Sequence, residues 1–105
     1  MISVNFTVHN GLITGYKVSG HSGYSEAGSD IVCSAVSSAA LMAANTVTEI
    51  QHIEAEVTVN DGFLNLNLSQ KDAEASRITL EGLRLHLTAL SQEYPQFIKV
   101  KISEV

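Results

Sequence analysis

The sequence predicts an α+β fold, a ββαββαβ sandwich in which two helices pack on a mostly antiparallel sheet. Three observations predict it. Two pairs of alternating apolar and polar segments are each joined by a glycine-containing turn, two longer segments have helical periodicity, and one further alternating segment comes last. With 105 residues, of which 45% are hydrophobic, the chain is expected to form a single domain, residues 1–105.

The first hairpin is predicted from a segment, residues 1–9, in which apolar and polar residues alternate without a fault. A two-residue loop after it would set Val4 against Lys17 and mismatch the apolar faces of the two strands. A three-residue loop sets Val4 against Tyr16 instead, so we predict that longer loop. In it, Gly11 is expected to adopt a positive φ within a G1 bulge.

The second hairpin favours the shorter loop. A two-residue Asp61-Gly62 turn pairs apolar residues with one another throughout. The predicted pairs are Val59 with Leu64, Val57 with Leu66, and Ala55 with Leu68.

Between the hairpins, a long apolar segment predicts the central helix, capped by Ser29 or Asp30 and running to about Gln51. Its most apolar run, residues 31–44, falls short of the roughly 20 residues that cross a bilayer, so we expect no membrane span. The predicted buried face comprises Ile31, Val32, Val36, Ala39, Ala43, Val47 and Ile50.

A second helix is predicted to open at Ser69, which with Asp72 resembles a capping box, and to end before Pro95. The core stripe of this helix is predicted to be Leu80, Leu83, Leu87, Leu90 and Tyr94. A second small or apolar strip lies on the opposite side and consists of Ala75, Ile78, Gly82, Leu85 and Ala89. Either another element of the chain or a twofold partner covers this strip, and we favour the partner. Residues 97–105 alternate again and predict a fifth strand.

Composition excludes several classes of function. The net charge of −5 and the scatter of only six Lys and Arg residues argue against a nucleic-acid partner, although an acidic surface suits a basic protein. A single cysteine rules out an intramolecular disulfide and a multi-cysteine zinc site, and His9, His52 and His86 show no ligand spacing. We therefore expect neither metal nor cofactor. No secretory signal precedes the first strand, which predicts a cytoplasmic protein.

One segment combines residues that could carry chemistry. Cys33 follows His21 by twelve residues, across a glycine-rich loop that leads into the central helix. We expect Cys33 in the first helical turn, where free N–H groups and the helix dipole favour a thiolate and offer donors to an oxyanion. His21 follows the end of the second strand and could act as the base. A buried cysteine that serves only for packing is the alternative.

Three neighbouring features each allow two interpretations. Asp30 either caps the helix or orients His21 as the third member of a triad. Ser37 lies one turn after Cys33, where it could support the site or serve only for its small size. The loop Ser22–Gly28, with Tyr24, Glu26 and Gly28 as candidate substrate contacts, is either a lid or an ordinary surface connection.

The same segment resembles the signature of the bacterial ribosomal-processing cysteine protease family, called Prp. The residues that carry the resemblance are Gly20, His21, Gly28, the run Asp30-Ile31-Val32-Cys33, Ala35 and Ser37. The resemblance implies a His21–Cys33 catalytic dyad, with Gly20, Asp30 and Ser37 in support. It also implies a small α+β fold and a homodimer.

The substrate implied by this resemblance is the N-terminal extension of large-subunit ribosomal protein twenty-seven, removed just after a phenylalanine. Two alternatives remain from the residues alone. The chain could be a non-catalytic ribosome-assembly module that binds the same segment or ribosomal RNA. Cys33 could also be a regulatory redox thiol, which the lack of a second cysteine disfavours.

Overall fold

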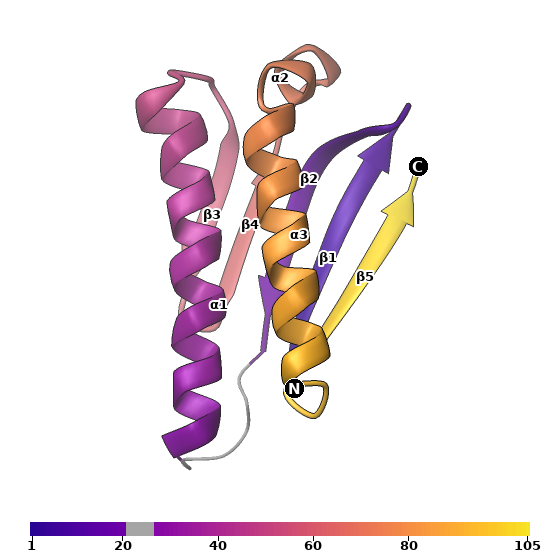
Figure 1. Cartoon of the computed structure of the whole chain (residues 1–105). Coiled ribbons are helices and arrows are strands. Elements are labelled where there is room, and N and C mark those ends of the chain that lie inside the picture. The colour runs from indigo at the N-terminus through magenta and orange to yellow at the C-terminus, as the bar shows by residue number, and fades with distance from the viewer. Residues whose placement is uncertain (21–26) are drawn as a thin grey trace.

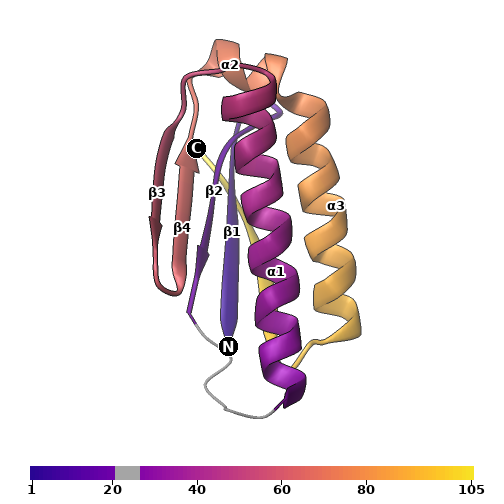
Figure 2. The same cartoon turned by 90° about the vertical axis from the view of Figure 1, so that its left-hand side faces the viewer.

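A computed structural model describes residues 1–20 and 27–105, without the side chains of residues 27–30. The strands are β1 (Ile2–His9), β2 (Leu12–Ser19), β3 (Glu56–Asn60), β4 (Phe63–Asn67) and β5 (Ile98–Glu104). The helices are α1 (Ala27–Asn45), the π-helical turn η1 (Thr46–Ile50), α2 (Gln70–Ala75) and α3 (Arg77–Glu93). The predicted α+β fold is confirmed. Two long helices, α1 and α3, lie side by side on one face of a five-stranded sheet (Figures 1 and 2).

The sheet has the strand order β3-β4-β2-β1-β5. All neighbours are antiparallel except β1 and β5, because α3 carries the chain across the sheet before β5 begins. The order places β3 and β5 at the two edges and the two hairpins side by side. Consequently the end of β2 lies beside the turn between β3 and β4, where the Gly20 N–H donates a hydrogen bond to the Gly62 carbonyl oxygen at 3.0 Å.

The loop predicted for the first hairpin is wrong. His9 pairs with Leu12, so the loop has two residues, Asn10 and Gly11, both at positive φ, and no G1 bulge is needed. The apolar faces still match because the register shifts farther along, where Thr14 is an extra residue between the two paired positions. The positive φ of Gly11, 78°, is confirmed, although it arises from a tight primed turn.

In the second hairpin the predicted two-residue turn is confirmed, with Val59 opposite Leu64 and Val57 opposite Leu66. The ladder ends at Glu56 and Asn67, so the predicted pairing of Ala55 with Leu68 lies beyond it.

The core lies between the sheet and the two long helices. From the sheet it takes Ile2, Val4, Phe6, Val8, Ile13, Tyr16, Val18, Leu64, Leu66 and Ile98. From the helices it takes Val32, Val36, Ala40, Ala43, Ala44, Val47, Leu80, Leu83 and Leu87. Buried Tyr16 also donates a hydrogen bond from its hydroxyl to the Ala40 carbonyl oxygen at 2.8 Å, which fixes α1 against β2. Burial raises the pKa of Tyr16 well above its ordinary value.

The central helix differs from the prediction at both ends. It begins at Ala27, before Ser29 and Asp30, so neither residue is its N-cap. Ile31 and Ile50 were expected in the buried face but are 65% and 74% exposed. At the far end the cause is η1, because its wider turn rotates the residues away from the period of an α-helix.

The segment Ile31–Ile50 is longer than the apolar run considered from the sequence. By length and composition alone it could cross a membrane, with a mean hydropathy of 1.5. In this structure 33% of that segment is buried, and α1 packs against α3 and supplies core residues, as the central helix of a compact domain does.

The helix predicted after the second hairpin is divided in two. The Ser69 hydroxyl accepts a hydrogen bond from the Asp72 N–H at 3.2 Å, which confirms the predicted cap. The chain then leaves helical geometry at buried Ser76 before α3 begins. In α3 the predicted core stripe is confirmed, with Leu80, Leu83 and Leu87 buried.

Candidate functional site

Cys33 lies on α1 and packs partly buried against the core. It is the seventh residue of the helix and therefore belongs to the second turn, not to the first as predicted. Helix N–H groups beyond the first four residues are bonded within the helix, and the dipole effect falls off within the first turn. The backbone N–H of Cys33 is thus not a free oxyanion donor, and the predicted argument for activating its thiol loses its premise, the place of Cys33 in the first turn.

A pocket of about 330 Å³ opens beside Cys33. Its walls are the N-terminal half of α1, the end of β2 and the turn between β3 and β4. Figure 2 shows that these three parts lie in the same half of the molecule. The lining residues are Ile2, Val18, Gly20, Cys33, Val36, Ser37, Ala40, Leu41, Val59, Asn60, Asp61, Gly62, Phe63 and Leu64. Three predicted site residues, Gly20, Cys33 and Ser37, therefore share one pocket.

The pocket is mostly apolar. Val36, Leu41 and Val59 contribute aliphatic side chains, and Asp61 is the one ionisable carboxylate among the described lining residues. A partly exposed thiol at the side of an apolar pocket can meet the backbone of a bound peptide while a neighbouring apolar side chain enters the pocket. The arrangement fits a peptide ligand better than an anion, because no Lys or Arg belongs to the described lining.

Gly20 has a structural reason to be glycine. Its φ is +93°, a conformation that L side chains rarely adopt, and a Cβ built there would lie 2.6 Å from the Met1 carbonyl oxygen. Its N–H is bonded to the Gly62 carbonyl oxygen. Gly20 therefore allows the backbone at the end of β2 to pass close to both Met1 and the β3–β4 turn, directly before His21.

The remaining predicted site residues stand as follows. His21, Tyr24 and Glu26 lie outside the described residues. Gly28 lies in α1, so the predicted loop Ser22–Gly28 was two residues too long. Asp30 is the fourth residue of α1, which leaves only the second of its two interpretations, the orientation of His21, as a prediction.

The residues missed by the sequence analysis are those of the β3–β4 hairpin, chiefly Val59, Asn60 and Asp61. The Asp-Gly turn was itself predicted, but its place beside the end of β2 depends on the strand order. No local pattern encodes that order. The one usable signal for this strand order was that β2, already paired with β1, needs a second strand on its other side. In the structure β4 takes that position.

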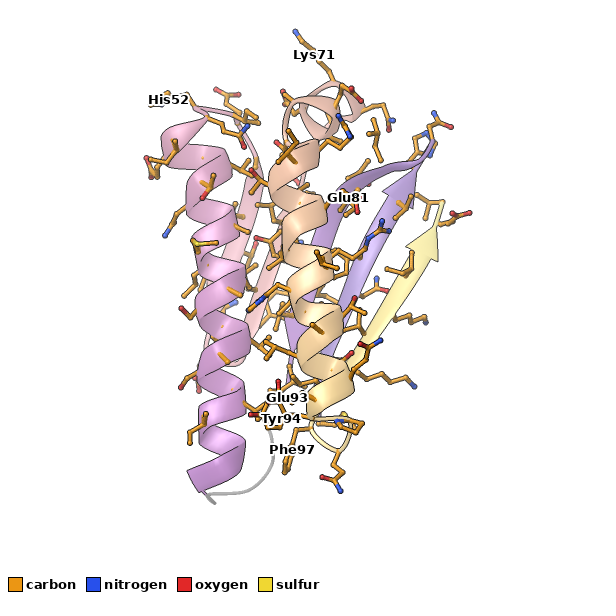
Figure 3. All side chains as sticks on the ribbon, viewed as in Figure 1. His52, Lys71, Glu81, Glu93, Tyr94 and Phe97 are labelled. Carbon is orange, nitrogen blue, oxygen red and sulfur yellow. The ribbon has the colours of Figure 1, made fainter. Side chains whose placement is uncertain are left out.

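The histidines in the described part of the chain lie away from this pocket, since none of them lines it. His52 is near the end of the molecule that carries α2, whereas Tyr94 and Phe97 mark the opposite end, where α1 starts (Figure 3). His86 lines the groove between α1 and α3, and the His9 ring Nδ1 is 2.8 Å from the Val105 carbonyl oxygen. None of these three can serve Cys33 as a base in this arrangement.

Comparison with solved structures identifies close relatives in fold. SMU.848 from Streptococcus mutans is 27% identical, with a TM-score of 0.85 over 100% of this chain and 96% of that one. The ribosomal processing protease Prp from S. aureus, in complex with a substrate peptide, is 22% identical, with a TM-score of 0.87 over 98% of this chain and 100% of that one. The same protease with a covalently linked product peptide is 23% identical, with a TM-score of 0.86.

The sequence comparison agrees with the structural one. No curated protein is significantly similar to this chain in sequence. The profile of one family, described as cysteine protease Prp, matches residues 1–99 and so includes the whole pocket. With Cys33 beside that pocket and the fold shared with solved Prp structures, this chain belongs to the Prp family of cysteine proteases.

Proposed function

We propose that the chain is a cysteine endopeptidase whose catalytic dyad is His21 and Cys33. The observation that carries the proposal is the pocket shared by Cys33 and Gly20, because Gly20 is the residue directly before His21. The other three histidines lie elsewhere, which leaves His21 as the chain's candidate base. Ser37 lines the same pocket, which supports a role for it in the site. The proposed role of Asp30 is to orient the His21 ring.

In the proposed reaction, His21 takes the proton of the Cys33 thiol, and the thiolate sulfur attacks the carbonyl carbon of the scissile peptide bond. The imidazolium then returns the proton to the leaving amine as the carbon–nitrogen bond breaks. An acyl-enzyme remains on the sulfur. His21 next removes a proton from water, whose oxygen attacks the thioester, and the carboxylic acid product and the free thiol are released.

The proposed substrate is the precursor of large-subunit ribosomal protein twenty-seven, cut just after a phenylalanine. Two properties of this chain support it. The apolar pocket beside Cys33, about 330 Å³ in volume, is large enough for an aromatic side chain. The net charge of −5 suits a basic ribosomal protein, whose encounter with the enzyme then slows as salt rises. Tyr24, Glu26 and Gly28 are the proposed substrate contacts from the segment that follows His21 in the sequence.

The test is cleavage of a synthetic peptide that spans the junction of this extension, followed by mass spectrometry of the products. We expect one cut after phenylalanine by the native chain and none by Cys33→Ala or His21→Ala. Ser34→Ala, one residue from the nucleophile and exposed, is the matched control and should cleave normally. Cleavage retained by either dyad variant would reject the mechanism, and no cleavage by any chain would favour a non-catalytic binding module.

We further propose a cytoplasmic homodimer, without nucleic acid as a direct partner. The strip on α3 predicted to need a cover is open in the single chain, with Ile78 81% and Leu85 74% exposed. Met42, 65% exposed, lies beside it, and α1 and α3 form an apolar groove between them. A second copy placed about a twofold axis would bury this helical face, defined by Met42, Ile50, Ile78 and Leu85.

A further inference from the structure

The edge strand β3 has no strand on its outer side in the described part of the chain. Every one of its residues, Glu56–Asn60, is exposed, and its only partner in the described structure is β4. An edge with unpaired backbone groups is a template for another strand unless a protein protects it with a bulge, a proline or inward-pointing charge. The sequence of β3, EVTVN, contains no proline, and its register with β4 is regular.

The backbone groups that face this open edge can be assigned from the neighbouring ladders. At the two ends of β4, the Gly62 carbonyl oxygen and the Leu68 N–H are bonded to the β2 side. Even-numbered residues of β4 therefore bond to β2 and odd-numbered residues bond to β3, since the two sides alternate along a strand. The hydrogen-bonded partners on β3 are then Glu56, Thr58 and Asn60. The N–H and carbonyl groups of Val57 and Val59 point to the open edge.

The side chains of these same two residues are uncovered on the core side of the sheet. Val57 and Val59 pair with buried Leu66 and Leu64, so they lie on the face that packs under the helices. Yet they are 38% and 54% exposed. An apolar residue on the core face is ordinarily covered in full, so at this edge the outward backbone groups have no partner among the described residues and the side chains are covered only in part.

The open edge is continuous with the pocket that holds Cys33. Val59 belongs to both, and Leu41 of α1, 40% exposed, borders the same pocket. The opposite edge, β5, also has an exposed core-face residue, Ile102, at 44%. None of β5, however, belongs to the described lining of the pocket, so of the two described sheet edges it is β3 that leads an extended chain toward the thiol.

We infer that β3 binds the peptide substrate by strand addition, with Val57 and Val59 as the main-chain partners. The inference rests on the proposed function and adds to it the way in which substrate is held. A peptide paired along β3 places every second side chain on the core face, next to Val57, Val59 and Leu41, and its backbone continues past Asn60 to Cys33. Main-chain pairing gives affinity, and the alternate side chains give specificity.

The first test compares Val59→Pro with Ile102→Pro. Proline removes the outward N–H at each site and leaves the inner ladder in place, because proline is tolerated on edge strands. The β5 site is matched in its backbone. The Ile2 N–H bonds to the Phe97 carbonyl oxygen and the Val105 N–H bonds to the Val8 carbonyl oxygen, so odd-numbered residues of β5 bond to β1. The backbone N–H and carbonyl groups of even-numbered residues, Ile102 included, therefore point away from the sheet. We expect the KM for the junction peptide to rise about fivefold in Val59→Pro, the factor that one net hydrogen bond contributes. In Ile102→Pro it should not change.

The second test leaves the protein unaltered, so that misfolding of a variant cannot obscure the result. Junction peptides carrying a single N-methyl group at successive positions are assayed with the native chain. Strand addition predicts that KM rises with a period of two, since only alternate peptide N–H groups face β3.

The inference is overturned if native cleavage proceeds with no alternation and with equal KM values for both proline variants. It is also overturned if Val59→Pro lowers self-association while KM stays unchanged, which would assign the edge to a second copy of the chain. Failure of the proposed function is distinct, because it requires that the native chain cleaves none of the unmodified peptide.

Discussion

Substitution of Gly20 by alanine tests how the chain leaves β2 at the site. At φ +93° an alanine is strained by about 1–2 kcal/mol. Its Cβ would also lie 2.6 Å from the Met1 carbonyl oxygen, which cannot easily retreat because the adjoining Ile2 N–H is bonded to the Phe97 carbonyl oxygen at 2.8 Å. Relieving that contact costs about 1–3 kcal/mol more, as overpacking does.

Gly11→Ala is the matched control. Gly11 also has a positive φ, +78°, but nothing lies within 4 Å of a Cβ built there, so only the conformational cost applies. We therefore expect Gly20→Ala to unfold at a melting temperature about 5–20 °C below that of Gly11→Ala, from the extra 1–3 kcal/mol and the usual scaling for a domain of this size.

The assay is thermal unfolding followed by circular dichroism, with peptide cleavage measured below both transitions. Because Gly20 holds the Gly62 carbonyl oxygen beside the pocket, cleavage by the folded Gly20→Ala chain should also fall, while Gly11→Ala cleaves normally. Equal melting temperatures for the two variants would refute the close approach of Gly20 to the first strand.

Three further predictions follow from the core and the helical face. Tyr16→Phe should cost about 0.5–1.5 kcal/mol in urea unfolding, because it removes the hydrogen bond to the Ala40 carbonyl oxygen. Burial raises the pKa of Tyr16 in the folded state, so its contribution to the free energy of unfolding is present below pH 10 and is lost as pH rises above that value. The free energy of unfolding of Tyr16→Phe should therefore fall less than that of the native chain above pH 10. Ser76→Ala should leave the melting temperature unchanged or raise it, because the buried Ser76 hydroxyl has no hydrogen-bond partner among the described residues, and a large drop would contradict this. Ile78→Glu should convert a dimer to a monomer in light scattering, whereas Ile102→Glu on the edge of the sheet should not; an unchanged mass for Ile78→Glu would exclude the helical face as the interface.

The fold was predictable where the pattern is local. Alternation located the five strands, the Asp61-Gly62 turn fixed one register, and Ser69 marked the start of α2. Alternation alone cannot reveal an extra residue, so the register shift at Thr14 made a correct two-residue loop look mismatched. Capping preference placed the start of α1 too late, because Asp30 is also favourable inside the first helical turn.

Only part of the candidate site could be predicted from the sequence. Gly20, Cys33 and Ser37 meet in one pocket, as their shared segment suggested. The opposite wall, from Val59 to Asp61, comes from the strand order β3-β4-β2, a long-range arrangement that no spacing along the chain encodes. Cys33 also lies in the second helical turn, where the free N–H groups and the dipole of the helix start do not reach it. In the proposed dyad, formation of the thiolate is therefore assigned to His21.

Covalent trapping is the most direct test of the proposed activation of Cys33 by His21. A peptide chloromethyl ketone ending in phenylalanine is incubated with the native chain and with His21→Ala at pH 7, and intact mass is followed over time. We expect one adduct per chain, located at Cys33, that forms at least about a hundredfold more slowly without the histidine, the usual contribution of a general base. Equal rates for the two chains, or no adduct until the protein is unfolded, would contradict it.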